Sequence, residues 1–113
     1  MTTTALHSVL REGMEAAYDT QHRTVWPELI LALREAGITD WRIWRSGRDL
    51  FHLLETDDFD AAMSHLATSD VDARWQNFIN TIVDHFEEGP DGRPMRFVWS
   101  LSGQANAATA SSV

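Results

Sequence analysis

The chain has 113 residues, no cysteine, and a formal net charge of −8, and all nine of its basic residues are arginine. This length suits a single domain, and the lack of cysteine excludes disulfides, a thiol nucleophile and thiolate metal sites. The arginines are scattered, whereas nucleic acids and anionic membranes require a clustered basic surface. A neutral small molecule is therefore the expected partner, with no role in binding nucleic acid or membranes.

Apolar runs along the chain are short. None approaches the roughly 18 residues that a membrane-spanning helix needs, and the segment MTTTALHSVLREG lacks the basic and apolar regions of a signal peptide. We therefore expect a cytoplasmic enzyme or binding protein.

The first part of the chain predicts one strand followed by two helical segments. Residues 4–11 have the β-branched and apolar character of a strand, and residues 14–22 have helical composition. Trp26 and Pro27 interrupt the run, and proline is tolerated at the start of a new helix, where its missing N–H costs nothing. That helix covers 27–37 and ends at Gly37, a residue type common just after helices.

The middle of the chain predicts a hairpin followed by a short helix. Residues 39–46 alternate in polarity and residues 50–56 are apolar, with the turn GRD between them. Asp57 or Asp58 then caps a helix over 59–68.

The remainder of the chain predicts a longer helix and a last strand. Ser69 or Asp70 opens a helix over 71–86, in which apolar side chains recur at helical spacing. A loop over 87–94 leads to a strand over 95–101. We expect residues 1–101 to form one domain and the small residues of 102–113 to form a flexible tail.

The resulting order is β-α-β-β-α-β with each helical segment divided in two. This order is typical of the α+β ferredoxin-like fold, an antiparallel sheet with helices on one face. Trp41 and Ile43 would share one face of the sheet and Trp44 the other, so large apolar groups would remain on the uncovered face. Two sheets paired face to face would bury them, and we expect a homodimer.

Tyr18 and His22 are the first candidate for chemistry. They lie four residues apart and so project from one face of a helix. An imidazole exchanges protons near neutral pH, and a phenol beside it can hydrogen-bond a hydroxyl group. A solvated histidine beside a half-buried tyrosine would show the same spacing. The nearby Trp26 favours a site, because indole faces stack on sugars, although Trp26 could also belong to the core.

The other histidines form no metal-binding pattern, and we expect no metal. His65 and His85 are expected to have structural or surface roles. His7 and His52 lie on predicted strands and could reach a pocket on a face of the sheet.

The segment DVDARWQNF is the second candidate. Trp75 fits the apolar stripe of its helix, while Arg74 falls on the flank. Trp75 could be a core residue with Asp70 as a helix cap, or it could form a pocket wall beside Gln76, whose amide would bind ligand hydroxyls. Phosphate-binding loops, nucleotide fingerprints and nucleophile elbows are lacking in the sequence.

The segments YDTQHRTVWPELILALREAGITDWRIW and LFHLLETDDFDAAMSHLATSDVDARWQNF resemble the L-rhamnose mutarotase family. The similarity runs from about residue 5 to residue 101. The pairing of H-x3-WPEL with D-V-x2-RW makes it specific, since either motif alone would be weak.

This resemblance implies a dimeric α/β barrel, an isomerase without cofactors that interconverts the α and β anomers of a monosaccharide, a six-carbon deoxy sugar. The histidine matching His22 would be the proton donor, and the tyrosine matching Tyr18 would contact the sugar. Trp41 and the pair Trp75 and Gln76 would complete the site, with Trp26 as a further apolar wall.

Two positions depart from the family pattern. The position of Trp41 is commonly tyrosine, and that of Gln76 is commonly a second tryptophan. Indole cannot accept a hydrogen bond as a phenol can, so L-fucose is an alternative substrate. A binding protein without catalysis and a cofactor-free monooxygenase on the same fold are the alternative functions, since a fold alone does not fix a function.

Overall fold

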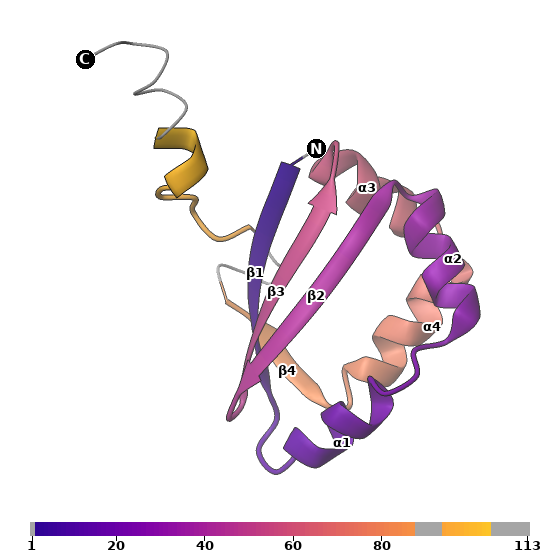
Figure 1. The fold of residues 1–113 in the computed structure, drawn as a ribbon. Coiled ribbons are helices and arrows are strands. Elements are labelled where there is room, and N and C mark those ends of the chain that lie inside the picture. The colour runs from indigo at the N-terminus through magenta and orange to yellow at the C-terminus, as the bar shows by residue number, and fades with distance from the viewer. Residues whose placement is uncertain (1, 88–93, 105–113) are drawn as a thin grey trace.

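The computed structural model describes residues 2–87 and 94–104, and its elements follow the predicted order. They are β1 (Thr2–Leu10), α1 (Glu15–Gln21), α2 (Pro27–Glu35), β2 (Ile38–Ser46), β3 (Asp49–Thr56), α3 (Phe59–Leu66), α4 (Asp70–Ile79) and β4 (Val83–Phe86). The four strands form one antiparallel sheet in the order β2-β3-β1-β4. The helices lie on one face of this sheet (Figure 1), as the ferredoxin-like fold requires.

Local sequence explains most of the helix boundaries. Trp26 has an extended backbone because the residue before a proline is disfavoured in the helical region, and Pro27 then occupies the first turn of α2. Gly37 follows that helix with a φ of 95°, which glycine adopts without steric cost. The side chain of Asp58 caps α3 by accepting from Ala61 N, and Ser69 caps α4 by accepting from Asp72 N.

The core lies between the sheet and the helices. Alternate residues of β1 and β3 point toward the helices and are buried, and Leu10, Leu50 and Leu54 have no exposed surface. Each fully buried leucine contributes about 1.5–3 kcal/mol relative to an exposed one. Ile79 and Val83 close the core from α4 and β4.

The last helix and last strand differ from their predicted positions. The helix expected over 71–86 ends at Ile79, and residues 83–86 form β4 against Ser8, Val9 and Leu10 of β1. Ile82, Val83 and Phe86 fit the apolar spacing of a helix, but β1 offers an edge that a strand satisfies with backbone hydrogen bonds. The local pattern could not reveal this tertiary partner.

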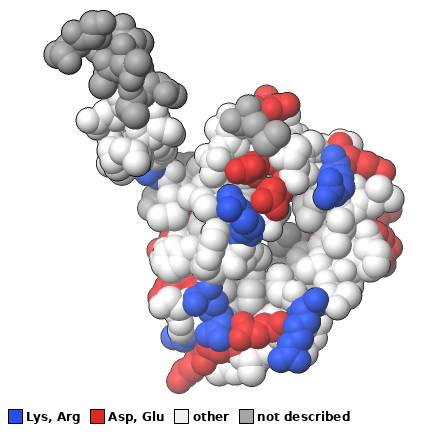
Figure 2. Space-filling model, in the orientation of Figure 1, with Lys and Arg blue, Asp and Glu red and all other residues white. Residues whose placement is uncertain are grey.

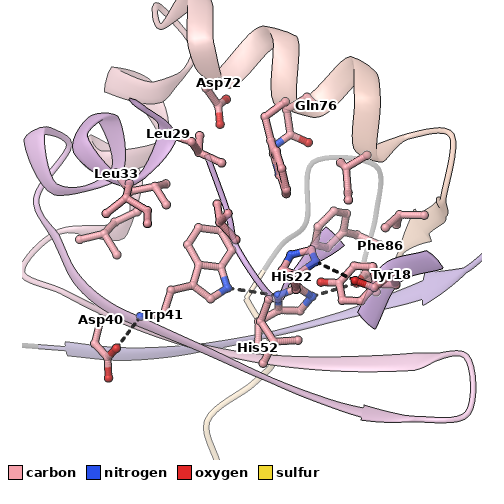
Figure 3. Close-up of a pocket in the computed structure, with 18 of the residues that line it drawn as sticks. Tyr18, His22, Leu29, Leu33, Asp40, Trp41, His52, Asp72, Gln76 and Phe86 are labelled. Carbon is pink, nitrogen blue, oxygen red and sulfur yellow. Dashed lines mark hydrogen bonds between the residues drawn. The ribbon is translucent and has the colours of Figure 1, made fainter. Parts of the chain in front are cut away.

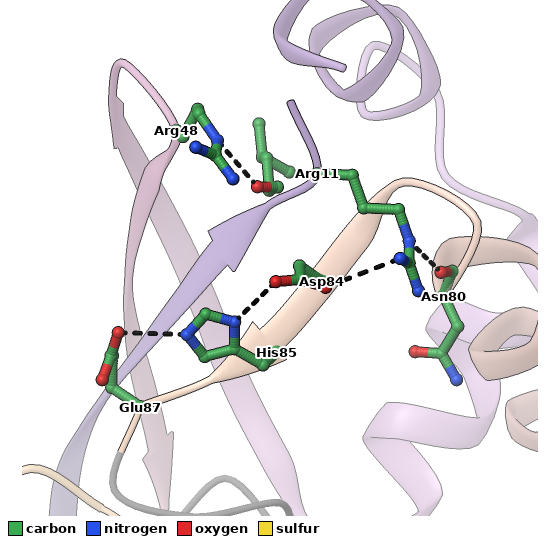
Figure 4. Close-up of polar contacts among 7 residues, drawn as sticks. Arg11, Arg48, Asn80, Asp84, His85 and Glu87 are labelled. Atoms are coloured by element: carbon green, nitrogen blue, oxygen red, sulfur yellow. Dashed lines mark hydrogen bonds and ion pairs between the residues drawn. The ribbon is translucent and has the colours of Figure 1, made fainter. Parts of the chain in front are cut away.

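Side-chain contacts hold β4 at this edge (Figure 4). Arg11 donates from Nε to the carbonyl oxygen of Asn80 at 3.0 Å and lies 3.5 Å from Asp84. His85 bridges Asp84 and Glu87, and these carboxylates raise its pKa, Asp84 through the largest effect. The contacts of Arg11 hold the start of this four-residue strand in place, and those of His85 hold its end.

The strand predicted over 95–101 is wrong. Met95 N donates to the carbonyl oxygen of Ala5 at 2.7 Å, but the segment 96–100 then forms no strand and residues 101–104 form one helical turn. We call residues 95–104 the C-terminal arm; it extends away from the sheet in Figure 1. Most of the loop predicted over 87–94 and residues 105–113 of the predicted tail lie outside the described residues.

The surface carries its charges in a mixed arrangement. Acidic and basic side chains are interspersed over the face shown in Figure 2, without a continuous basic stripe on that face. Within residues 2–87 and 94–104, no helix has both the length and the apolar character needed to span a membrane.

Candidate active site

A cavity of about 330 Å³ lies between the sheet and the helices. Its size falls at the lower end of the range usual for ligand pockets. The lining includes five residues predicted for the site, with side chains from α1, β2 and α4 and from the loop after α1: Tyr18, His22, Trp41, Trp75 and Gln76. Figure 3 shows Tyr18, His22 and Trp41 converging on the space from different elements.

Helix α1 brings Tyr18 and His22 together. Their rings stack with centroids 4.1 Å apart and an interplanar angle of 19°, as side chains one turn apart can. The helix is tied to the end of β2 by a bidentate ion pair, in which Arg45 donates to both oxygens of Asp19 at 2.8 and 2.7 Å. This pair fixes the side of the helix adjoining the site.

The hydrogen bonding of His22 defines which of its nitrogens carries the proton. Its Nδ1 lies 3.2 Å from the carbonyl oxygen of Tyr18, and a carbonyl oxygen can only accept, so Nδ1 carries the proton. Neutral His22 therefore has its lone pair on Nε2. Partial burial lowers the pKa of His22, which favours this neutral form at pH 7. The result is a neutral imidazole, able to act as a base, that lines the cavity.

The phenol of Tyr18 is a donor and not a base. Its side chain is buried, and burial together with the charge of Asp19 raises its pKa well above the usual range of tyrosine. The hydroxyl group remains protonated at every physiological pH and can donate a hydrogen bond to a ligand.

The predicted tryptophans occupy different positions relative to the cavity. Trp75 is buried and forms part of its wall, with its ring edge-on to His22 at 5.6 Å between centroids. Trp26 is absent from the lining and packs behind this wall against Trp75 and Phe78. The structure thus places Trp26 with the core, the role that its sequence context left open.

The cavity lining also contains residues that were not included in the predicted site. Ser8, His52 and Asp72 line the space, from β1, β3 and α4 respectively. Strand alternation could have placed His52 beside Leu50 and Leu54 on the helix-facing side. His7, which was considered with it, lies on the opposite face, where it bonds Asp49 and stacks on Phe51.

Asp72 adds a carboxyl group to the helical wall of the cavity. Burial raises its pKa, and the nearby Gln76 amide opposes that rise. The carboxylate and the amide lie one helical turn apart on α4, where both can meet ligand hydroxyl groups. Among residues 2–87 and 94–104, no cluster of three or more histidine, aspartate or glutamate side chains could hold a metal ion.

Comparison with known proteins gives one consistent result. Residues 3–101 match the family model described as L-rhamnose mutarotase. The L-rhamnose mutarotase of Burkholderia ambifaria strain MC40-6 is 38% identical over 96 residues, covering 83% of this chain and 88% of the relative. That of Paraburkholderia phytofirmans is 35% identical over 98 residues, covering 85% and 88%.

Solved structures show the same fold at lower identity. An L-rhamnose mutarotase from Formosa agariphila has a TM-score of 0.71 at 22% identity, covering 89% of this chain and 99% of that one. Tetracenomycin F2 cyclase from Streptomyces glaucescens has a TM-score of 0.52 at 18% identity, covering 88% and 96%. These two proteins share the fold and are named for different reactions. The reaction must therefore be inferred from the residues of the site and not from the fold.

Proposed function

The chain belongs to the L-rhamnose mutarotase family, isomerases that interconvert the α and β anomers of L-rhamnose, and we propose that it performs this reaction with His22 as its acid and base. The observation that carries the assignment of His22 is that it lines the cavity with Tyr18, while no hydrogen bond is found for its Nε2 among the described residues. Family membership favours catalysis over a binding protein or a monooxygenase.

The proposed reaction is a proton transfer between two oxygens of one carbon. Nε2 of His22 takes the proton of the anomeric hydroxyl, O1; the bond between C1 and the ring oxygen O5 breaks, and C1–O1 becomes an aldehyde. The imidazolium then protonates O5. Since O1 and O5 are both bonded to C1, one imidazole can serve both. Rotation about C1–C2 and the reverse steps give the other anomer.

Tyr18 orients the sugar in this proposal. Its phenol stays protonated because burial raises its pKa, so it donates a hydrogen bond to a sugar oxygen. Its ring also stacks on the imidazole and limits the rotation of His22. The face of Trp41 and the wall formed by Trp75 supply apolar surface, and Gln76 supplies an amide for hydroxyl groups.

A homodimer is the second part of the proposal. On the sheet face opposite the helices, Trp44 is 52% exposed and Phe51 is 39% exposed. In the C-terminal arm, Phe97 is 75% exposed and Trp99 is 59% exposed. A second copy of the chain would cover both apolar surfaces at once, and symmetric pairing of identical faces is the commonest form of assembly.

The first experiment is exchange NMR on the anomeric protons of L-rhamnose with the wild type and with His22→Ala. We expect enzyme-dependent exchange that falls by about 10²–10⁴-fold in the variant, the usual contribution of general acid–base catalysis. His65→Ala is the matched control, because His65 is an exposed histidine on α3. A folded His22→Ala variant with full rate would remove His22 from the mechanism.

The same measurement on L-fucose tests the choice of sugar. If Trp41 and Gln76 retain the specificity of the family, exchange of L-rhamnose is the faster of the two. Faster exchange of L-fucose would leave the reaction in place and reassign its substrate.

A further inference from the structure

Three side chains from three adjacent strands form a hydrogen-bonded chain on the sheet floor of the cavity. Trp41 of β2 lies with its Nε1 3.2 Å from Nδ1 of His52 on β3. His52 in turn lies with its Nε2 2.9 Å from Oγ of Ser8 on β1. All three line the cavity, and Figure 3 shows the bond from Trp41 to His52 beneath His22. We call these residues the floor chain.

The chemistry of indole fixes the direction of the floor chain. An indole N–H can only donate, so Nδ1 of His52 must present its lone pair to Trp41. In the neutral imidazole the single proton is therefore on Nε2, and Nε2 donates to Ser8 Oγ. The hydroxyl oxygen of Ser8 thus accepts a hydrogen bond from His52, and the hydroxyl hydrogen of Ser8 remains available to donate to another group.

The charge state of His52 preserves this direction at neutral pH. Burial lowers the pKa of His52 to about 4, assisted by nearby His22 and His7. A protonated His52 would turn an Nδ1–H toward the indole N–H, so the floor chain requires the neutral ring. His22 faces the same cavity, and its pKa is also lowered by burial, so the neutral form of both rings prevails at pH 7.

Ser8 therefore presents a donor whose acceptor must come from the cavity. Its side chain is 1% exposed, and no hydrogen bond other than the one with His52 is found for Ser8 Oγ among the described residues. Leaving a buried donor unpaired costs more than a typical hydrogen bond contributes, so a ligand that lacks an acceptor there is disfavoured. This asymmetry is the usual physical basis of discrimination between hydroxylated ligands.

We propose that Ser8 is a specificity-determining residue that donates a hydrogen bond to one sugar oxygen, and that His52 and Trp41 are positioning residues that hold its hydroxyl group for this purpose. The proposal rests on the proposed function and deepens it. It also revises the role of Trp41: its N–H is bonded to His52, so the indole offers the sugar its ring face alone.

The direction of the floor chain can be tested without any sugar. The imidazole ¹⁵N spectrum of the wild type at pH 7 reports which nitrogen of each histidine carries a proton. We expect the signals of His52 to show a bare Nδ1 and a protonated Nε2, and Trp41→Phe to perturb Nδ1. A protonated Nδ1 on His52 would overturn the proposal.

The role of Ser8 is tested with L-rhamnose and its 2-, 3- and 4-monodeoxy analogues. For the wild type, we expect kcat/KM for anomer exchange to fall by about tenfold for one analogue, the value of one hydrogen bond. In Ser8→Ala, kcat/KM for L-rhamnose itself should fall by the same factor. The variant should then have similar kcat/KM values for L-rhamnose and for that analogue. Thr4→Val is the matched control, because Thr4 is a buried hydroxyl residue of β1 outside the cavity lining.

Variants of His52 separate positioning from folding. His52→Leu should match Ser8→Ala in its loss of discrimination, while His52→Gln should retain part of it because an amide N–H can replace Nε2–H. An active wild type with unchanged discrimination in Ser8→Ala would overturn the inference and leave the proposed function intact. A wild type that exchanges none of the sugars would reject the proposed function and the sugar role of Ser8 with it.

Discussion

At the scale of single residues, the two cavity histidines are both neutral at pH 7, but they differ in how many of their ring nitrogens are hydrogen-bonded. Nδ1 of His22 is bonded to the backbone and no partner is found for its Nε2 within residues 2–87 and 94–104, whereas both nitrogens of His52 are bonded to side chains. A nitrogen without a protein partner can exchange a proton with a ligand. A ring whose two nitrogens are both hydrogen-bonded instead holds its neighbouring side chains in position. This difference in hydrogen bonding supports the two proposed roles, catalysis for His22 and positioning for His52.

Burial of His52 makes stability depend on pH. Its pKa is about 4 in the folded protein against the ordinary histidine value of 6.5, so the unfolded chain binds more protons between these values. The stabilisation is complete above pH 6.5 and is lost as the pH falls toward 4. A shift of this size corresponds to roughly 3 kcal/mol. His22 shifts in the same direction.

Urea unfolding at pH 7 and pH 4.5 would check this prediction. We expect the wild type to lose stability on acidification and His52→Gln to lose distinctly less between the two pH values. His85→Gln is the control, because the raised pKa of His85 gives a contribution of opposite sign, present at low pH and lost as the pH rises. Equal losses in the wild type and His52→Gln would argue against a neutral buried His52.

At the scale of elements, the divided first helical segment positions His22, the residue that we propose as acid and base. Helix α1 ends at Gln21 with His22 as its C-terminal cap, and Pro27 begins α2, so His22 lies at a helix end beside the cavity. If one continuous helix ran through both segments, His22 would lie in the middle of that helix and not at a helix end. The proline thus has a structural role that bears directly on the site.

Helix α4 depends on its cap for the position of Trp75 and Gln76. We expect Ser69→Ala to lower the free energy of unfolding by about 1 kcal/mol, because Asp72 N loses the acceptor that Ser69 provides. Ser69→Asp should restore stability. Ser64→Ala, at an exposed position within α3, is the control and should not destabilise. Thermal unfolding of the three variants measures the difference, and equal midpoints for Ser69→Ala and the wild type would exclude an energetic role for the cap.

At the scale of the whole molecule, the unburied apolar surface predicts assembly. Sedimentation velocity of the wild type at micromolar concentration should show a dimer. The double variant Trp44→Glu and Phe51→Glu should sediment as a monomer, because charges would be placed on the sheet face that we propose as the interface. Leu31→Glu, at an exposed apolar position on the outer side of α2, should remain a dimer. A monomeric wild type would contradict the proposal.

Sequence by itself determined the element order and most boundaries, and it singled out five residues that line the cavity. These features have local causes: the restriction that Pro27 imposes on Trp26, the positive φ of Gly37, and the four-residue spacing of Tyr18 and His22. Helix periodicity also indicated that Trp75 would be buried, and it is. Patterns within a few residues are sufficient wherever the backbone or one helix face sets the outcome.

Tertiary structure alone decided the last strand and the floor of the cavity. Ile82, Val83 and Phe86 suit either a helix or a strand, and only the free edge of β1 selects the strand. Ser8, Trp41 and His52 lie on three strands that are far apart in sequence, and the sheet register brings them into one hydrogen-bonded chain. Contacts between segments that are distant in sequence leave no pattern in either segment. These features could therefore be seen only in the folded structure.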